Sequence, residues 1–279
     1  MSSSVDPHAI LTALGVVDVG SALPILGGRD VALFRVEQGT ATSALRVYAP
    51  GRERQCRFEI QVMQHGAASG LPVPKVRTAG LWNDRPALLM EWLPGRTIAD
   101  AMNDDPSLAG PLGTAAGRML AQIHAIQPPR IVQARPWLAW VPIPEPLERA
   151  LAAASEPPRL LHLDYHPLNL LTDGATITGV LDWANAAAGD QRADLARTIT
   201  ILRFATGELP SDLQSALAVF ERGLLDGYEG AAGPLTNLPL FLAWAGHCLL
   251  QDLAERLTAE QRAAVIAWTG EREREAGVF

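Results

Sequence analysis

The sequence predicts an α+β protein with a strand-rich N-terminal part and a larger, mostly helical C-terminal part. Between about residue 20 and residue 93, apolar runs typical of strands are separated by turn residues, and one helical pattern lies among them. From about residue 95 onward, apolar residues recur mainly at helical spacing. Two short apolar runs, 168–172 and 177–181, interrupt this helical part. The length of 279 residues permits one large or two modest domains.

Three segments of the N-terminal part have strand character. Residues 31–36 form an apolar run after the pair Gly27-Gly28, and residues 43–48 alternate polar and apolar side chains. The two glycines could form a loop whose backbone N–H groups face phosphates, and an ordinary hairpin turn explains them equally well. Residues 87–93 read as a buried strand that runs into a Pro-Gly turn.

The C-terminal part carries several helix signals. Apolar residues recur at helical spacing over 112–123, and two prolines at 128–129 end that helix. Residues 128–146 are expected to be irregular, and Trp137 and Trp140 are expected to anchor this connection to the core rather than to line a substrate pocket. Further helix starts are predicted at Pro210, at Asn237 as an N-cap, and at a capping box formed by Thr258 and Gln261.

Residues 162–169, His-Leu-Asp-Tyr-His-Pro-Leu-Asn, carry the most informative chemistry of the chain. The Asp-Gly pair at residues 173–174 then predicts a hairpin, whose second strand leads into Asp182. The hairpin should therefore bring Asp164, Asn169 and Asp182 to one end of a small sheet.

Two carboxylates and one carboxamide at this spacing suit phosphoryl transfer, which requires positioning and electrostatics rather than covalent chemistry. Asp164 is expected to orient a substrate hydroxyl and accept its proton. Asn169 and Asp182 are expected to provide oxygen ligands for Mg²⁺. Any one of the three could be a turn or cap residue. Together, at the spacing of a kinase catalytic loop, they favour the functional interpretation.

These residues resemble the motifs of the aminoglycoside phosphotransferase family, in the protein-kinase-like superfamily that also contains choline and homoserine kinases. Family members typically read His-Gly-Asp-x-His-Pro-x-Asn, then Ile-Asp-Trp at the end of a strand, then Gly-Asp and Asp-Leu-Ala. The chain has Gly-Asp at residues 189–190 and Asp-Leu-Ala at residues 194–196. It departs from the pattern at Leu163, where Gly is usual, and at Leu168, where Gly is common. The change at Leu168 could alter the loop next to the hydroxyl acceptor.

The resemblance implies a two-lobed protein-kinase-like fold. A nucleotide-binding lobe with an antiparallel sheet and one helix would span residues 1–93, and a mostly helical catalytic and substrate-binding lobe would span residues 94–279. It also implies a small-molecule kinase that transfers the γ-phosphoryl group of ATP or GTP to a hydroxyl, with Mg²⁺ as cofactor.

Candidate nucleotide-binding residues follow from the same resemblance. Residues 59–63 are similar to the first-lobe helix, whose Glu pairs in kinases with a basic residue on the third strand. Glu59 is the best candidate for that Glu, with Glu53 second. Arg46 stands where protein kinases place Lys, and the alternative for it is an edge-strand Arg in solvent.

Glu91, Trp92 and Leu93 match the hinge between the lobes of the family, where backbone groups form hydrogen bonds with the edge of the adenine base. A plain core strand followed by a turn is the alternative.

Several further polar residues are assigned supporting roles. His162 and His166 are expected to hold the loop, and Asp190 and Asp194 to accept hydrogen bonds from loop N–H groups or a helix N-terminus. His124 matches a family His and is expected to be a packed residue. Four residues of the C-terminal helices could face a ligand or belong to the core: Tyr228, Trp244, His247 and Asp252.

Two other functions remain open from the sequence. In the first, His162, Asp164, His166 and Asp182 are ligands of a transition metal in a hydrolase, since imidazole and carboxylate are suitable donors. The second is a nucleotide-binding protein without catalytic activity, which only the imperfect glycine loop supports.

Composition limits the remaining classes. The net charge of −7 and the lack of a basic patch argue against nucleic-acid binding. No membrane span and no signal peptide are expected, which predicts a cytoplasmic protein. Cys56 and Cys248 lie far apart, without other Cys or His residues at ligand spacing, and are assigned no role.

The expected partner is a small hydroxylated molecule. The negative net charge is compatible with a cationic substrate, although charge spread over a surface usually serves solubility. The sequence leaves open the identity of the substrate, the choice between ATP and GTP, and whether the chain is a monomer or a dimer.

Overall fold

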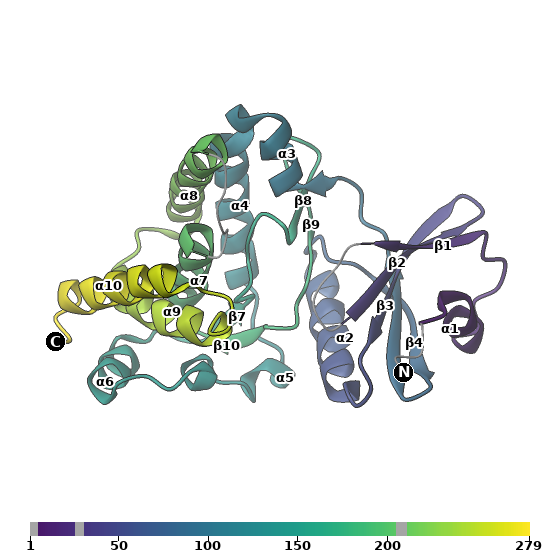
Figure 1. Ribbon diagram of the computed structural model, residues 1–279, viewed down its shortest axis with the longest axis horizontal. Helices are drawn as coiled ribbons and strands as arrows, with labels where there is room; N and C mark the ends of the chain where they lie inside the picture. The colour runs from purple at the N-terminus through teal and green to yellow at the C-terminus, as the bar shows by residue number, and fades with distance from the viewer. Residues whose placement is uncertain (1–4, 26–30, 205–210) are drawn as a thin grey trace. The chain divides into compact units, whose positions relative to one another are not determined.

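The computed structural model describes residues 5–25, 31–204 and 211–279, with side chains from residue 213 in the last segment. The chain forms two compact units, Met1–Pro94 and Gly95–Phe279, which are described separately (Figure 1). The predicted α+β class is confirmed, because an antiparallel sheet dominates the first unit and helices dominate the second. The assignment of nucleotide binding to residues 1–93 and catalysis to residues 94–279 stays a prediction. Within the described ranges, no helix has the length and apolarity needed to cross a membrane.

One antiparallel sheet, with strand order β1-β2-β3-β5-β4, forms the centre of the first unit. Leu45 and Val47 point to one face of this sheet, where they join a buried cluster with Ile10 and Leu11. Arg46 lies between them in the strand and therefore points to the other face, the face on which it meets a glutamate of α2. The elements are α1 (Pro7–Ala13), β1 (Ser21–Ile25), β2 (Val31–Gln38), β3 (Ala41–Tyr48), α2 (Glu53–Ala68), β4 (Val76–Trp82) and β5 (Arg85–Glu91).

Helix α1 is an element that the sequence pattern did not predict. Asp6 begins it, since its carboxylate accepts hydrogen bonds from the backbone N–H groups of His8 at 3.0 Å and Ala9 at 3.3 Å. Only two of its residues, Ile10 and Leu11, are buried. A helix with so few buried residues gives too short an apolar period to be recognised.

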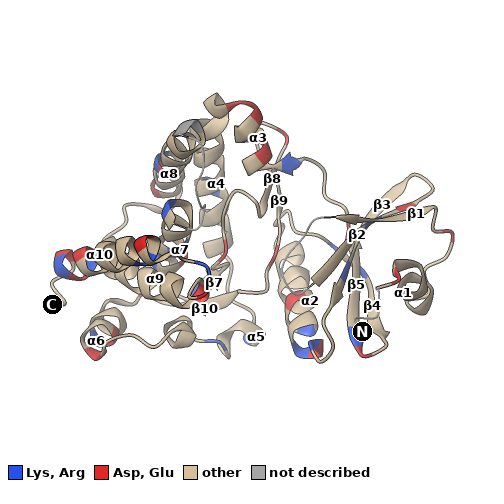
Figure 2. Ribbon diagram, viewed as in Figure 1, with Lys and Arg blue, Asp and Glu red and all other residues tan. Residues whose placement is uncertain are grey.

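The second unit combines helices with two small sheets, one formed by β7 and β10 and one with the order β6-β8-β9. Its elements are β6 (Arg96–Thr97), α3 (Ile98–Asp104), η1 (Pro106–Leu108), α4 (Ala109–His124), α5 (Arg130–Gln133), η2 (Trp137–Trp140), α6 (Glu145–Ala154), β7 (Arg159–Leu161), β8 (Leu170–Thr172), β9 (Ile177–Val180), β10 (Ala187–Gly189), α7 (Gln191–Phe204), α8 (Ser211–Ala232), α9 (Leu238–Asp252) and α10 (Ala259–Glu275). Basic and acidic residues are mixed along α10, as expected for a solvated helix (Figure 2).

Helices α4 and α8 lie side by side with their backbones in close contact (Figure 1). A Cβ atom on Gly117 would stand 2.1 Å from the carbonyl oxygen of Leu224, and one on Gly227 would stand 2.2 Å from that of Thr114. Side chains at these positions would force the helices apart. The glycines therefore fix α4, whose Ala116 carbonyl accepts a 2.8 Å hydrogen bond from the hydroxyl of Tyr165 in the catalytic-loop segment.

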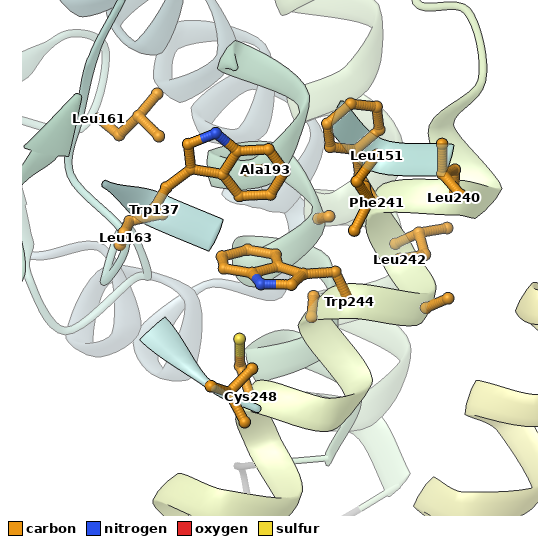
Figure 3. Packing of buried hydrophobic residues seen from close by; sticks show 14 of the residues in the cluster. Trp137, Leu151, Leu161, Leu163, Ala193, Leu240, Phe241, Leu242, Trp244 and Cys248 are labelled. Atoms are coloured by element: carbon orange, nitrogen blue, oxygen red, sulfur yellow. The ribbon is translucent and has the colours of Figure 1, made fainter. Parts of the chain in front are cut away.

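The main core of the second unit is built around aromatic rings (Figure 3). Trp137 stacks on Phe241 with a centroid separation of 5.6 Å and meets Trp244 edge-on at 4.8 Å. Trp137 thus anchors its segment to the core, as predicted, and Trp244 is a core residue rather than a ligand contact.

Two expectations about the helices need correction. Residues 128–146 are not wholly irregular, because α5 and η2 form short helical turns within them. Asn237 stands at the N-cap position of α9, but its φ of 57° is left-handed and its side chain makes no capping bond. The capping box of Thr258 and Gln261 is present as predicted.

Candidate active site

The β8–β9 hairpin places the polar residues of the candidate site, as predicted. Leu170 pairs with Val180 in the antiparallel ladder. Just beyond it, the backbone N–H of Leu181 donates a 2.8 Å hydrogen bond to the carbonyl oxygen of Asn169. Asp182, which follows Leu181, is therefore held close to the Asn169 backbone.

The imidazole of His162 connects the two carboxylate-bearing segments. Its Nε2 lies 2.9 Å from the carbonyl oxygen of Leu181, and its Nδ1 lies 3.3 Å from the backbone nitrogen of Asp164. Complementarity assigns the proton to Nε2, which donates, and leaves Nδ1 as the acceptor. Burial lowers the pKa of His162, against the charges of Asp194, Asp164 and Asp182, and so favours the neutral ring.

Asp194, in the first turn of α7, holds the beginning of the loop of residues 162–169. Its carboxylate accepts hydrogen bonds from the backbone N–H groups of His162 at 2.6 Å and Leu163 at 2.7 Å. Leu163 has a φ of 59°, in the left-handed region that favours glycine. Its side chain is fully buried in the core cluster, which offsets the strain and accounts for a leucine at this position.

A second set of contacts reaches Asp194 from far away in the sequence. His124 Nε2 lies 3.1 Å from the Asp194 carboxylate, and His124 Nδ1 lies 2.8 Å from the hydroxyl of Tyr228. Burial by itself would raise the pKa of Asp194, but hydrogen bonds from His124 and His162 and the charges of both rings hold it below its ordinary value. His124 is a packed residue as predicted, and Tyr228 belongs to the same buried network.

The Asp164 carboxylate is surrounded by the loop itself. His166 Nε2 lies 3.4 Å from its Oδ1, and the Asn169 amide nitrogen lies 3.3 Å from its Oδ2. Burial raises the pKa of Asp164, but the hydrogen bond and charge of His166, with the charges of His162 and Arg197, bring it below the ordinary value. Asp164 is therefore ionised at neutral pH, as a hydroxyl acceptor must be.

The donor set of Asn169 and Asp182 fits a hard divalent cation. The Asn169 amide nitrogen also donates to the carbonyl oxygen of Asp164 at 2.9 Å, which assigns the orientation of the amide and leaves its Oδ1 as an acceptor. Asp182 has a φ of 61°, so the backbone takes a left-handed turn where this carboxylate is presented. One carboxylate and one amide oxygen match the few protein ligands that Mg²⁺ uses beside nucleotide phosphates.

In the first unit, Arg46 and Glu59 form a buried ion pair. Arg46 Nη1 lies 2.8 Å from Glu59 Oε2, with 12% and 1% of the side chains exposed. The exposed-Arg alternative is therefore wrong, and Glu59, the best candidate for the acidic partner, is a residue that Arg46 meets. The aromatic ring of Tyr48 lies beneath the guanidinium, 5.3 Å from ring centroid to Cζ.

Residues 91–93 end the first unit and are half-buried. The backbone N–H of Glu91 donates to the carbonyl oxygen of Lys75 at 2.8 Å, so it is engaged within the sheet. Trp92 packs under Arg35, with 5.3 Å from Cζ to the ring centroid. Adenine recognition by Glu91, Trp92 and Leu93 stays a prediction. The Gly27-Gly28 loop lies outside the described residues.

The geometry does not favour the metal-dependent hydrolase. His162 uses both ring nitrogens within the protein, which removes it from a ligand set with Asp164, His166 and Asp182. In the part of the chain that the structure describes, no group of three or more His, Cys, Asp or Glu side chains could hold a metal ion. Both cysteines are buried and free.

One buried residue near the site was missed by the sequence analysis. Arg197 of α7 has a side chain only 5% exposed, and its Nη2 lies 2.7 Å from a carboxylate oxygen of Asp252. An arginine one helical turn after Asp194 was the available signal.

Comparison with known proteins places these motifs in a family. The model of the phosphotransferase enzyme family matches residues 21–143 and 133–234. Comparison with curated protein sequences returns no match.

Solved structures of aminoglycoside phosphotransferases share the fold. A thermostable mutant of aminoglycoside phosphotransferase APH(4)-Ia, in ternary complex with ADP and hygromycin B, is 17% identical with a TM-score of 0.68, and the match covers 97% of this chain and 98% of that one. The structure of aminoglycoside-3'-phosphotransferase of type VIII is 20% identical with a TM-score of 0.64, and the match covers 88% of this chain and 97% of that one. The gentamicin complex of APH(2")-IIa is 14% identical, with a TM-score of 0.62 and 99% of each chain covered. The chain has their protein-kinase-like fold, and the family model, which spans most of its length, shows that it belongs to the phosphotransferase enzyme family.

Proposed function

We propose that this phosphotransferase moves the γ-phosphoryl group of ATP or GTP to a hydroxyl of a small molecule. The observation that carries the proposal is the bridge made by His162, which holds the Asp164 backbone and the carbonyl of Leu181 to the same ring. A hydroxyl acceptor and an adjacent pair of cation ligands are thereby kept in a fixed relation, which is what phosphoryl transfer requires.

In the proposed reaction, Asp164 accepts a hydrogen bond from the substrate hydroxyl and takes its proton. The hydroxyl oxygen forms a bond to the γ-phosphorus, while the bond from that phosphorus to the bridging oxygen breaks and the nucleoside diphosphate leaves. Asn169 and Asp182 would hold Mg²⁺, which neutralises phosphate charge when bound. Neither nitrogen of His162 contacts substrate in this scheme, because both are used to hold the loop.

Arg46 is proposed to neutralise phosphate charge in the first unit. Glu59 orients its guanidinium through the buried ion pair. Backbone groups of the hinge segment, Glu91, Trp92 and Leu93, are proposed to form hydrogen bonds with the edge of the adenine base. A nucleoside triphosphate donor is consistent with the predicted cytoplasmic location.

The acceptor is proposed to be a small hydroxylated compound, with a cationic one compatible with the negative net charge of the chain. The related structures were solved with hygromycin B and with gentamicin, and those ligands belong to those proteins. Because these proteins have low sequence identity to this chain, the likeness supports a shared fold but not a shared substrate.

The test compares Asp164→Asn and Asp182→Asn with a control in the same hairpin, Asp173→Asn, whose exposed carboxylate caps the loop between β8 and β9. Asp164→Asn should lower kcat by about 10²-fold or more, because the proton acceptor is lost, while nucleotide binding persists. Asp182→Asn should instead weaken binding of the Mg²⁺-nucleotide complex. Unaltered turnover by Asp164→Asn would remove the assignment. Asp173→Asn should behave as the parent protein in both measurements.

A further inference from the structure

The backbone at Asp182 needs support from both sides. Its φ of 61° is left-handed, a conformation that a residue other than glycine keeps only where the surrounding structure imposes it. On the N-terminal side, the backbone N–H of Leu181 donates to the carbonyl oxygen of Asn169 at 2.8 Å. The carbonyl oxygen of Leu181 lies 2.9 Å from Nε2 of His162. The direction of the Asp182 carboxylate depends equally on what holds the chain on the C-terminal side.

An arginine from a distant segment holds that side. Arg135 Nη1 donates a 2.9 Å hydrogen bond to the carbonyl oxygen of Ala184, two residues after Asp182. The turn of residues 183–186 also contains a bond of its own, from the backbone N–H of its last residue to the carbonyl oxygen of its first, at 3.2 Å. A hydrogen bond from a charged donor is about twice as strong as one between neutral groups. The contact with Arg135 therefore adds strongly to the turn's own bond.

The segment that carries Arg135 is fixed to the core of the second unit. It runs from α5 to η2, and α5 lies beside β10 (Figure 1). Pro136 forms a parallel bridge with Ala188 of β10, and the next residue, Trp137, belongs to the aromatic core. The ring of Trp140 packs beneath the guanidinium, 5.8 Å from Cζ to the ring centroid. The donor is thus held through both its backbone and its side chain, so it can keep the turn in one position.

We propose that Arg135 is a positioning residue for Asp182, which keeps its carboxylate directed at the Mg²⁺ of the nucleotide complex by holding the carbonyl of Ala184. This inference rests on the proposed role of Asp182. Arg135 is not itself a cation ligand, because a guanidinium donates hydrogen bonds and accepts none. Segment 128–146, whose sequence suggests only an irregular connection, then supports the cation site.

The sign of one measurement separates positioning from charge. If Arg135 only contributed a positive charge, its removal would make Mg²⁺ bind more tightly, because like charges repel. If Arg135 positions Asp182, its removal makes Mg²⁺ bind more weakly. Partners that orient metal ligands typically contribute about 10- to 100-fold to affinity, and Arg135 acts through the backbone, so the lower end of this range is expected.

The experiment titrates Mg²⁺ into the full chain in the presence of a non-hydrolysable ATP or GTP analogue and measures its Kd by calorimetry. Arg135→Met keeps an apolar stem over Trp140 and removes the donor. It should raise the Kd for Mg²⁺ about tenfold, while the Kd of the analogue without Mg²⁺ stays the same. Arg130→Met, at an exposed position of the same segment, is the matched control and should leave both constants unchanged.

Hydrogen exchange of the protein without ligands tests the turn directly. In Arg135→Met, the backbone N–H groups of residues 183–186 should exchange faster, because local opening of the turn becomes easier. Exchange in the rest of the second unit should be unchanged. A general loss of stability would instead accelerate exchange throughout the unit.

A double-mutant cycle connects Arg135 with Asp182. In the Asp182→Asn background, Arg135→Met should weaken Mg²⁺ binding by less than about twofold, because the carboxylate that it positions is already lost. Arg135→Gln is a second variant, in case Arg135→Met does not fold. It removes the charge and shortens the side chain, and it should raise the Kd for Mg²⁺ in the same direction.

Three results would overturn the proposal: an unchanged or lower Kd for Mg²⁺ in a folded Arg135 variant, unchanged exchange at residues 183–186, or the full tenfold effect of Arg135→Met in the Asp182→Asn background. Failure of the proposed function is distinguishable from these. A parent protein that binds no Mg²⁺-nucleotide complex contradicts the proposed function, and the role of Arg135 falls with it. A parent protein that binds the complex, beside an Arg135→Met variant that binds it equally well, contradicts the role of Arg135 alone.

Discussion

The Asp194 carboxylate accepts a 2.7 Å hydrogen bond from the backbone N–H of Leu163, a leucine held at a φ of 59°. The left-handed conformation costs a non-glycine residue about 1–2 kcal/mol. This conformation of Leu163 turns the chain between His162 and Asp164. The His162 ring therefore points to the carbonyl oxygen of Leu181, and the Asp164 carboxylate points to Asn169. The conformation of the proposed catalytic loop thus depends on a carboxylate about thirty residues further along the chain.

Replacing Asp194 by Ala should therefore lower both stability and activity. Two buried backbone N–H groups lose their acceptor and His124 loses a partner, which together should reduce the free energy of unfolding by about 3–5 kcal/mol. Urea unfolding measures this change. The control is Asp104→Ala, which removes an exposed ion pair with Arg96 and should cost less than about 1 kcal/mol. Equal losses in the two variants would contradict the role of Asp194.

How far the sequence predicted this site depends on the range of the contacts. Asp164 and Asn169 precede the β8–β9 hairpin and Asp182 follows it, so their proximity follows from one local turn. The bond from His124 to Tyr228 joins residues separated by 104 positions, and no local pattern indicates it. Arg197 escaped notice for the same reason, because its partner Asp252 is on another helix. Local periodicity predicts elements, and packing decides which buried polar groups meet.

In the N-terminal part, too, local strands could be predicted from the sequence and contacts between distant residues could not. The strands of residues 31–36 and 43–48 were predicted because each is long and clearly patterned. The pairing of Arg46 with Glu59 required the family resemblance, since strand and helix periodicity alone do not say which helix covers the sheet. Helix α1 stayed unpredicted because only two of its residues are buried.

Stability should depend on pH through His162. Burial lowers the pKa of this ring in the folded protein, so below about pH 6.5, the value of an unperturbed histidine, the unfolded chain binds a proton that the folded chain does not. The contribution of His162 is thus fully present above about pH 6.5 and is lost as the pH falls toward the lowered pKa. The free energy of unfolding should decrease by up to about 1.4 kcal/mol per pH unit in that window.

Denaturant unfolding between pH 5 and 8 measures this slope. His162→Gln keeps a hydrogen-bond donor but cannot be protonated. This variant should lower the slope of the free energy of unfolding against pH by the amount that corresponds to nearly one proton. His8→Gln, at an exposed position, should not alter it. A slope that is the same in all three proteins would show that His162 does not carry the effect.

Glu59→Gln should impair use of the nucleotide. The substitution keeps the size of the side chain but removes the negative charge that lies 2.8 Å from Arg46, so the guanidinium loses its orientation. The KM for nucleotide should rise about tenfold, the loss expected for one charge-assisted bond, with little change in the KM for the acceptor. Glu37→Gln, which breaks a surface pair with Arg35 on the same sheet, is the control and should leave both constants unaltered. A rise confined to the acceptor constant would argue against the role of the Arg46–Glu59 pair.

Leu168→Asn should change the acceptor preference without loss of stability. The side chain of Leu168 is 62% exposed. Its backbone is held on one side by Pro167, whose carbonyl oxygen accepts a 3.1 Å hydrogen bond from the backbone N–H of Ala99, and is followed by Asn169. A fixed backbone thus presents an apolar side chain to solvent one residue from a proposed Mg²⁺ ligand. The free energy of unfolding should change by less than about 0.5 kcal/mol, because no buried contact is lost. The KM for an acceptor with an apolar face should rise severalfold while that for nucleotide stays the same, as measured by initial rates. Leu81→Asn, also at an exposed position, serves as the control, and an equal effect of both substitutions on the acceptor would show that Leu168 makes no specific contact.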